Sequence, residues 1–341
     1  MYRFKDDYSE GAHPRILEKL IETNFEQLEG YGLDKYSVEA AGKIRELIEK
    51  PDADIHFVSG GTQANLLFIS HALRPYESVI AVDTGHINVH ETGSIEAVGH
   101  KINVVPNIDG KITVENIAKV LEFNADEHMV LPRMVYISNS TELGTIYTKK
   151  ELEAISEFCK KNNLYLFVDG ARIGVALTSE YNDMSFADLA SMVDAMYIGG
   201  TKNGALLGEA IVIMNDELKS YFRHSIKQKG ALLAKGRVAG IQFLELFKDD
   251  LYFSLARHSN NTAKLLALGI EKLGYKFKTN IRTNQIFPIL PDRIIEKLIS
   301  KFEFYVWERY DETSSVVRLV TSWATPKSAV DEFIEYLELI S

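Results

Sequence analysis

Two apolar segments of this chain each lead directly into polar residues that could do chemistry. Residues 164–168 are followed by Asp169 and Arg172, and residues 195–198 are followed by a glycine-rich turn that carries Lys202. Short apolar runs bounded in this way are typical of strands buried in a parallel sheet. Because ligands of such sheets bind outside the carboxyl ends of the strands, both segments are expected to direct their polar side chains into one crevice.

An aspartate, an arginine and a lysine in one crevice suit pyridoxal phosphate. This cofactor needs a lysine amine for a Schiff base and a carboxylate beside its pyridine nitrogen, which keeps the ring protonated and electron-withdrawing. Taken singly, Asp169 is explained as well by a helix cap, and Lys202 by a solvated surface lysine. Their combination, with glycines on both sides of the lysine, favours the cofactor hypothesis.

Residues 59–65, S-G-G-T-Q-A-N, form a candidate phosphate site. They follow an apolar run and open a predicted helix, where free backbone N–H groups and the helix dipole attract anions. The segment matches neither the G-x-G-x-x-G pattern of dinucleotide sites nor the G-K-[ST] of a P-loop, which disfavours nicotinamide and ATP. The alternative is a plain tight turn between a strand and a helix.

A second candidate anion contact lies in residues 220–244, which contain basic but no acidic residues. In a chain of net charge −10, this local excess favours a phosphate or carboxylate ligand. A solvated basic helix face is the alternative for the individual lysines. Arg237 is the strongest candidate, since glycine and apolar residues flank it.

Length and composition limit the class of protein. A chain of 341 residues predicts one large and one small domain, and contents of 46% hydrophobic and 25% charged residues are ordinary for a globular protein. The net charge of −10 argues against nucleic acid and anionic membranes as partners. The single Cys159 excludes an internal disulfide, and neither a signal peptide nor an apolar stretch of about 18 residues is found. We therefore expect a cytoplasmic protein.

Strand and helix signals alternate over most of the chain, which predicts a mostly parallel sheet covered by helices on both faces. Strands are expected at residues 55–58, 78–82, 101–105, 134–137, 164–168, 195–198 and 209–214. Helices are expected at residues 14–24, 37–49, 62–73, 88–98, 216–229, 232–247 and 252–273, and capping signals at Thr148 and Ser185 start two more.

The last part of the chain has a different pattern, which predicts a separate α+β domain. Its strands are expected at residues 276–279, 284–290, 305–308 and 316–321, and its helices at residues 292–301 and 326–339. We divide the chain into an N-terminal arm and helix (1–25), a large α/β domain that binds the cofactor (26–250) and a small C-terminal α+β domain (251–341).

Five segments together resemble the low-specificity L-threonine aldolases, namely S-G-G-T-Q-A-N, G-H-I-N-V-H-E-T-G, V-D-G-A-R, T-K-N-G and V-V-R-L-V-T-S-W. These enzymes belong to the β-eliminating lyase group within the fold type I, or aspartate-aminotransferase-like, pyridoxal phosphate enzymes. The similarity spans nearly the whole chain. It implies this α/β fold, a carbon–carbon lyase of amino acid metabolism with pyridoxal 5'-phosphate as cofactor, and a homodimer or homotetramer with active sites at the subunit interface.

The resemblance implies roles for the cofactor contacts. Lys202 would form the Schiff base, Asp169 would pair with the pyridine nitrogen, and His86 would lie flat on the pyridine ring. The remaining contacts, to the phosphate or the ring oxygen, would come from Gly61, Thr62, Arg172, Thr201 and, across a subunit interface, Arg237. A purely structural role is the alternative for His86.

The resemblance also implies substrate contacts. Arg318 would bind the substrate α-carboxylate with its planar fork of donors, and Tyr31 would line the substrate pocket. Arg318 lies inside an apolar predicted strand, where a guanidinium needs an anionic partner. A structural Asp or Glu is the alternative to a substrate in that position.

Two departures from the family pattern concern the substrate. Many members have a Thr-His-Asn segment before the strand that carries Asp169, whereas this chain has Glu142 in place of the histidine. A glutamate there would act as a base, orient a water or select a different substrate. A Ser-Asp pair near the family's N-terminus is replaced by residues 6–9, D-D-Y-S, in which Ser9 is the candidate carboxylate contact.

The resulting hypothesis is a retro-aldol cleavage of L-threonine or L-allo-threonine to glycine and acetaldehyde. Arg318 would hold the carboxylate, and Glu142 through a water, or a phosphate-side group, would take the proton of the β-hydroxyl. No metal is expected. The alternatives are β-elimination from a substituted alanine, a class V-type aminotransferase or hydroxymethyl transferase, and a ligand-sensing relative, against which Lys202 argues.

Overall fold

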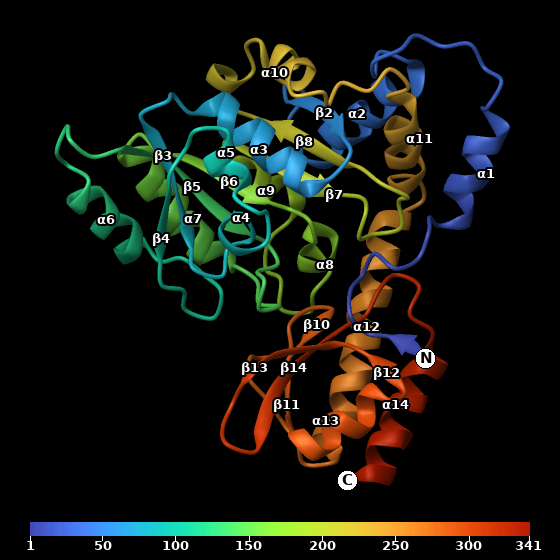
Figure 1. Cartoon of the computed structure of the whole chain (residues 1–341). Helices are drawn as coiled ribbons and strands as arrows, with labels where there is room; N and C mark the ends of the chain where they lie inside the picture. Colours follow the sequence, from blue (N-terminus) through green and yellow to red (C-terminus); the bar gives the residue numbers. More distant parts are fainter.

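The computed structural model describes all 341 residues, and Figure 1 shows a larger and a smaller part joined by the long helix α12 (Leu251–Lys272). The larger part, termed the large domain, contains a seven-stranded sheet in the order β2-β8-β7-β6-β5-β3-β4. Its strands are β2 (Asp54–Val58), β3 (Glu77–Val82), β4 (Ile102–Val105), β5 (Leu131–Ser138), β6 (Tyr165–Asp169), β7 (Ala195–Gly199) and β8 (Glu209–Ile213).

The sheet is mostly parallel, as predicted. Strands β4, β3, β5, β6 and β7 pair in parallel, and β8 is antiparallel to both of its neighbours. Residues 200–208 connect β7 to β8 without a crossover helix, and such a direct return produces an antiparallel neighbour. The turn that carries Lys202 therefore lies at the carboxyl end of β7.

Helices cover both faces of the sheet, because successive side chains of a strand point to opposite faces. Phe167 of β6 packs in one core with α3 (Gly61–Ala72) and α10 (Phe222–Gln228). Its neighbour Val168 packs in the opposite core with α2 (Lys35–Leu47), α7 (Lys149–Lys161) and α11 (Arg237–Leu246). The other helices of this domain are α1 (Pro14–Glu22), α4 (His86–Val89), α5 (Ser94–Ala97), α6 (Val114–Phe123), α8 (Ile173–Leu177) and α9 (Phe186–Met192).

The smaller part, termed the small domain, is an antiparallel sheet packed against helices. Its strands are β9 (Lys276–Phe277), β10 (Gln285–Ile286), β11 (Pro288–Pro291), β13 (Tyr305–Arg309) and β14 (Ser314–Val320). Buried residues of α12, α13 (Asp292–Ile299) and α14 (Lys327–Ile340) form its core with them. The α+β pattern of the last part of the chain is thus present.

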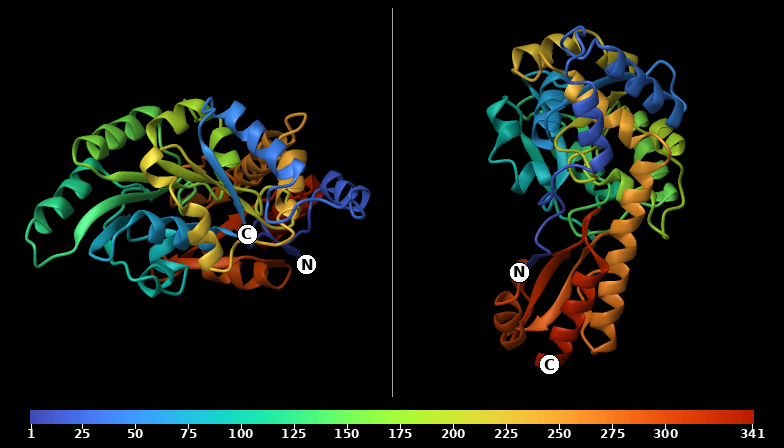
Figure 2. Two further views of the ribbon diagram at one scale, coloured as in Figure 1. Left: turned by 90° about the horizontal axis from the view of Figure 1, so that it is seen from above. Right: turned by 90° about the vertical axis from the view of Figure 1, so that its right-hand side faces the viewer.

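The N-terminal arm connects the two domains a second time. Strand β1 (Tyr2–Arg3) pairs in parallel with β12 (Phe302–Glu303) of the small domain. The chain then continues to α1, which packs beside α11 of the large domain, as the right-hand view of Figure 2 shows. Residues 4–13 therefore pass the boundary between the domains.

Some predicted elements differ from the structure for local reasons. The helix expected at 88–98 is two short helices, α4 and α5, because Thr92 and Gly93 adopt left-handed backbone angles of φ 53° and 71°. Tyr221, with φ 61°, likewise separates a 3₁₀ turn at Asp216–Leu218 from α10. Helix α6 was not predicted, since its capping box uses Asn116 instead of the usual Glu or Gln. No helix is both long and apolar enough to cross a membrane.

Candidate active site

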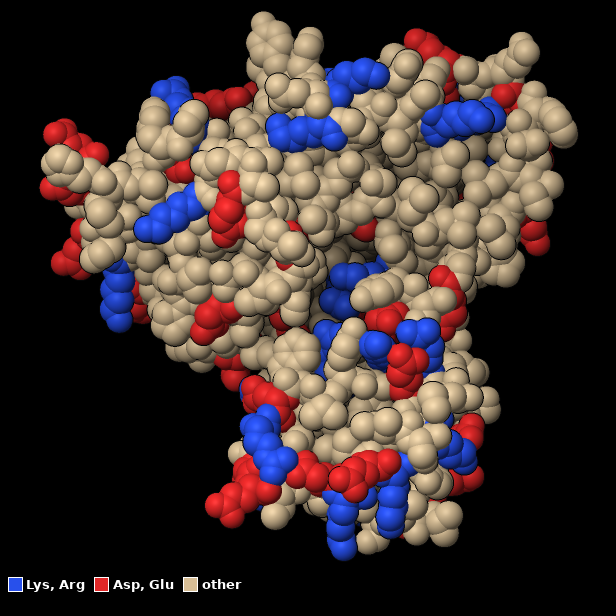
Figure 3. Space-filling model, viewed as in Figure 1, with Lys and Arg blue, Asp and Glu red and all other residues tan.

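A cavity of about 470 Å³ opens at the carboxyl ends of the parallel strands, between the two domains and the N-terminal arm. Figure 3 shows lysine and arginine side chains inside this hollow. The residues that line it are Tyr8, His86, His90, Glu142, Arg172, Lys202, Gln285, Tyr305, Val306, Trp307 and Arg318. Five of the predicted site residues thus line one cavity. Four of them, His86, Glu142, Arg172 and Lys202, follow four different strands, and Arg318 lies on β14.

Lys202 lies in the turn between β7 and β8 and forms no ion pair. Its neighbour Thr201 stabilises this turn, because Thr201 Oγ1 accepts a hydrogen bond from the Gly208 N–H at 3.0 Å. Burial, and then the positive charge of Arg172, lower the pKa of the Lys202 amine. A lowered pKa increases the fraction of neutral amine, which is the form that attacks a carbonyl carbon.

Asp169, at the end of β6, is 4% exposed and accepts hydrogen bonds on both carboxylate oxygens. Oδ1 accepts from Tyr197 Oη at 2.5 Å and from the Ala171 N–H at 3.1 Å. Oδ2 accepts from Tyr136 Oη at 2.5 Å and from Asn65 Nδ2 at 3.1 Å. Four donors, from residues in or directly after three neighbouring strands and from α3, therefore hold the carboxylate.

His86 is connected to Asp169 through Glu91 and Asn65. His86 Nδ1 lies 2.7 Å from Glu91 Oε1, and Asn65 Nδ2 donates to both Glu91 Oε1, at 2.7 Å, and Asp169 Oδ2. Burial by itself would raise the pKa of the Asp169 carboxyl, but the charge of His86 and the donated hydrogen bonds outweigh it and hold this pKa below its usual value. An ionised carboxylate in this place suits a protonated pyridine nitrogen.

Glu142 faces the cavity from the turn after β5. Its Oε1 accepts from Ser138 Oγ at 2.6 Å and from the backbone N–H of His86 at 3.0 Å. Burial raises the pKa of the Glu142 carboxyl, although the Ser138 hydrogen bond opposes this. A carboxyl group with a raised pKa exchanges its proton closer to neutral pH, which suits a general base.

Arg172 lines the cavity but is already paired. Its guanidinium forms a bidentate ion pair with Asp7 of the N-terminal arm, and Asn284 Nδ2 donates to the same carboxylate at 3.0 Å. The contact of Arg172 with the cofactor stays a prediction. In this structure Arg172 fixes the arm against the domain boundary.

Arg318 of β14 has no carboxylate partner. Its guanidinium carbon lies 5.0 Å from the ring centroids of both Tyr305 and Trp307, and Nη2 donates to the backbone oxygen of Lys5 at 3.2 Å. Nε is buried without a hydrogen-bond partner. The alternative of a structural Asp or Glu is therefore absent, and a buried guanidinium with an unused donor suits an anionic ligand.

Gly61 is the first residue of α3, and no side chain caps this helix. A Cβ at Gly61 would lie 2.8 Å from Tyr197 Oη, so only glycine fits here without a shift. The neighbouring Thr62 is exposed, with its hydroxyl free to meet a ligand. Free N–H groups at an uncapped helix start fit a phosphate.

Three predicted residues lie away from this cavity. Tyr31 is 42% exposed and lines a separate cavity, where its ring is 4.8 Å from Lys227 Nζ. Arg237 donates to the backbone oxygen of Glu26 at 2.6 Å. Ser9 is exposed and donates to Asp6 Oδ1 at 2.8 Å, while Tyr8 lines the cavity.

Several residues that shape the site were not predicted from the sequence, namely Asp7, Tyr8, Asn65, Glu91, Tyr136 and Tyr197. Glu91 had a usable signal, because it lies five residues after His86 in the G-H-I-N-V-H-E-T-G segment. The tyrosines had none, since aromatic residues are common in strands for packing alone.

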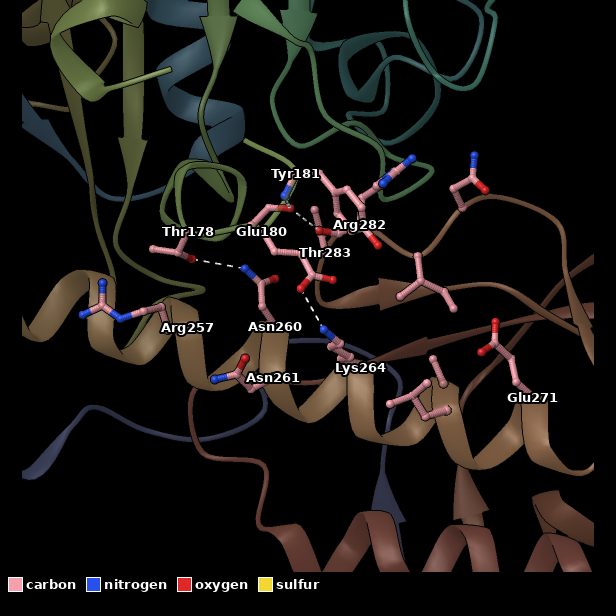
Figure 4. A pocket seen from close by; sticks show the side chains of 15 residues that line it. Thr178, Glu180, Tyr181, Arg257, Asn260, Asn261, Lys264, Glu271, Arg282 and Thr283 are labelled. Atoms are coloured by element: carbon pink, nitrogen blue, oxygen red, sulfur yellow. Dashed lines mark hydrogen bonds and ion pairs between the residues drawn. The ribbon is translucent and has the colours of Figure 1, made fainter. Parts of the chain in front are cut away.

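Figure 4 shows a second cavity, of about 400 Å³, between α12 and the segments 178–181 and 280–283. Three of its charged groups already have partners within the lining. Lys264 Nζ lies 2.7 Å from Glu180 Oε2, and the Arg282 guanidinium carbon stacks 3.6 Å from the Tyr181 ring centroid. None of the predicted site residues lines it, so the chemistry belongs to the first cavity.

Known proteins share this architecture. A solved threonine aldolase from Leishmania major covers 100% of both chains with a TM-score of 0.98 and 50% identity. An aromatic aminotransferase from Pyrococcus horikoshii has a TM-score of 0.73 at 16% identity and covers 99% of this chain and 95% of its own. The fold and the site together define a fold type I pyridoxal phosphate-dependent enzyme, which confirms the predicted fold class and cofactor.

Sequence comparison narrows the class. The pattern of the beta-eliminating lyase family matches residues 6–292. A low specificity L-threonine aldolase of Pseudomonas aeruginosa is 32% identical over 99% of this chain and 97% of its own length. The chain belongs to the beta-eliminating lyase family. The predicted family and the predicted lyase class are thereby confirmed.

Proposed function

We propose that this protein cleaves L-threonine or L-allo-threonine to glycine and acetaldehyde in a pyridoxal phosphate-dependent retro-aldol reaction. One observation carries the proposal. Lys202 and Arg318, neither of which has a carboxylate partner, line one cavity. The buried carboxylate of Asp169 lies within 4.8 Å of a ring nitrogen of His86, which lines the same cavity. The names of the similar proteins from Pseudomonas aeruginosa and Leishmania major support the choice of substrate.

The residues present fit the cofactor. Lys202 would supply the amine that binds it, and Asp169 would keep its pyridine nitrogen protonated. The start of α3, with Gly61 and Thr62, would hold the phosphate, and His86 would support the ring. When bound, the cofactor withdraws electrons from the α-carbon of an amino acid and so weakens the bonds at that carbon.

The remaining residues would act on the substrate. Arg318 would bind the α-carboxylate and so set which bond at the α-carbon is exposed to the reaction. Glu142 would take the proton of the β-hydroxyl on a carboxylate oxygen, directly or through a water. Tyr8, Tyr305 and Trp307 would cover the cavity and exclude bulk water.

We further infer a homodimer or homotetramer in which Tyr31 and Arg237 serve a neighbouring subunit's site. Their position away from the cavity of their own subunit supports this arrangement. A cytoplasmic location is proposed as well, and the single Cys159 supports it.

The test is release of acetaldehyde from L-threonine and L-allo-threonine, coupled to NADH oxidation by added alcohol dehydrogenase. Lys202→Ala serves as the control, and the visible absorption of the bound cofactor is recorded for both proteins. Aldehyde release that is lost with Lys202→Ala supports the proposal. A protein that binds the cofactor but releases no aldehyde contradicts it, and pyruvate with ammonia, or a 2-oxo acid, would identify β-elimination or transamination instead.

A further inference from the structure

The hydroxyl groups of Tyr136 and Tyr197 make the shortest contacts to Asp169. Tyr136 lies on β5 and Tyr197 on β7, the two strands that flank β6, and each donates at 2.5 Å to a different carboxylate oxygen. We infer that Tyr136 and Tyr197 are positioning residues that hold Asp169 as an oriented anion for the pyridine nitrogen of the cofactor. The inference rests on the proposed function in naming that cofactor.

The sheet register sets this arrangement. Tyr136 pairs with Phe167, two residues before Asp169 and therefore on the same face of the sheet. The register of β6 and β7 brings Tyr197 next to Asp169. Both tyrosine rings are 1% exposed and lie in the core between the sheet and α3.

Packing alone does not explain two hydroxyl groups in this core. A phenylalanine at either position would fill the same space without a polar atom, and a buried hydroxyl costs free energy unless it is paired. Burial, and then the charge of Asp169, raise the pKa of both tyrosines, so both stay protonated donors. Their distances match those of charge-assisted O–H···O⁻ bonds, which are about 2.5–2.7 Å long.

The two tyrosines act on different parts of the site. Each carboxylate oxygen of Asp169 receives one tyrosine O–H and one N–H donor, so removal of one tyrosine hydroxyl leaves that oxygen with its N–H donor alone. Tyr197 also borders the start of α3, because its Oη occupies the space of a Cβ at Gly61. It therefore sets the distance between the carboxylate and the proposed phosphate site.

Other titratable groups act on Asp169 from every side and must be separated from the tyrosines. His86 lies in α4, Glu91 follows α4, and Glu142 follows β5. Lys202 lies in the turn between β7 and β8, and Glu209 is the first residue of β8. Burial raises the pKa of the Glu209 carboxyl to about 8, so this group also changes its charge near neutral pH. Only the difference between proteins that differ by one hydroxyl reports on the tyrosines.

The experiment compares Tyr136→Phe, Tyr197→Phe and the double variant with the wild-type protein. Tyr147→Phe is the matched control, because Tyr147 is a buried tyrosine whose Oη accepts from the Ile112 N–H at 2.9 Å and does not contact Asp169. Two quantities are measured between pH 3 and 8, the melting temperature of the cofactor-free protein and the Kd for pyridoxal phosphate by fluorescence quenching.

The sign follows from the lowered pKa of Asp169. A carboxyl whose pKa is depressed by folding stabilises the protein above its unfolded pKa, and this stabilisation is lost as the pH falls through the folded pKa. Loss of a donor raises the folded pKa. Cofactor binding should weaken as Asp169 becomes protonated at low pH. We expect the pH at which this weakening sets in to rise by about one unit for each hydroxyl removed. The loss of melting temperature in the two tyrosine variants should be larger at pH 7 than at pH 3, whereas the loss in Tyr147→Phe should be the same at both pH values.

Folded single variants that keep the wild-type pH profile of cofactor binding, with a pH-independent loss of melting temperature, would overturn the inference. The single variants decide the matter if the double variant does not fold. None of these readouts involves threonine. A protein with the predicted shift but without aldehyde release therefore contradicts the proposed reaction alone, and a wild-type protein that does not bind pyridoxal phosphate overturns both.

Discussion

Arg172 of the large domain and Asp7 of the N-terminal arm form a bidentate ion pair, with Nε 2.7 Å from Oδ2 and Nη2 3.0 Å from Oδ1. The Asp7 side chain is 1% exposed and also accepts from Asn284 of the small domain. Burial by itself would raise the pKa of the Asp7 carboxyl, but the charge of Arg172 outweighs it and holds this pKa below its usual value. One carboxylate thus joins the arm and both domains beside the cavity.

Asp7→Asn should destabilise the protein because it leaves the buried Arg172 guanidinium without a counter-charge. Breaking a buried pair in this way costs about 3–5 kcal/mol. We expect a lower melting temperature at pH 7 and a smaller difference from the wild type at acid pH, where the wild-type carboxyl is protonated as well. Thermal unfolding followed by circular dichroism at several pH values measures this.

Glu303→Gln is the matched control for that substitution. Glu303 pairs with Arg3 and Lys5 at the same arm, but the Glu303 side chain is 36% exposed and the Arg3 side chain 51%. Exposed pairs contribute little, so the melting temperature should stay close to that of the wild type. Equal losses for both variants would show that the Asp7 pair is no stronger than a surface pair.

Glu142→Gln should lower kcat for threonine cleavage by about 10²–10⁴-fold, the usual contribution of a general base. Because burial raises the pKa of the Glu142 carboxyl, the wild-type rate should rise with pH through a value above that of an exposed glutamate, which is about 4.3. The rate of the variant should not show this rise with pH, since glutamine does not titrate. A variant with the wild-type rate and profile would assign the proton transfer to another group.

Arg318→Leu should lower kcat/KM for L-threonine by about 100-fold or more, because the substrate carboxylate loses a buried charged partner. The same variant should raise the melting temperature of the cofactor-free protein, since it removes a largely buried cation whose Nε has no partner. Arg309→Leu is the control, because the Arg309 side chain on the neighbouring strand is 56% exposed. A loss of stability in Arg318→Leu would show that its ring contacts outweigh the cost of burial.

Gly61→Ala should weaken pyridoxal phosphate binding by about tenfold or more, because its Cβ would meet Tyr197 Oη at 2.8 Å and displace the start of α3. Gly60→Ala is the control, since a Cβ there has no neighbour within 4 Å. Equilibrium titration with the cofactor measures both. Equal affinities for the two variants would argue against a phosphate site at this helix start.

The chemistry at the sheet edge was predictable because it depends on short segments. An apolar run that ends in Asp169, and another that ends in a glycine-rich turn with Lys202, specify a strand and the polar group after it within ten residues. A parallel sheet then brings these groups to one edge regardless of the details of packing. The two capping boxes, at Thr148 and Ser185, were predictable for the same reason and are present.

Long-range contacts were decided only by the tertiary structure. The pairing of Asp7 with Arg172 joins residues 165 positions apart, and the placement of Tyr136 and Tyr197 on the two oxygens of Asp169 depends on the register of three strands. Neither leaves a local pattern. The sequence alone determined which residues carry the reactive groups, whereas the packing of distant segments decided which of them are paired, buried or free, because burial and hydrogen bonding depend on neighbours that the chain supplies from elsewhere.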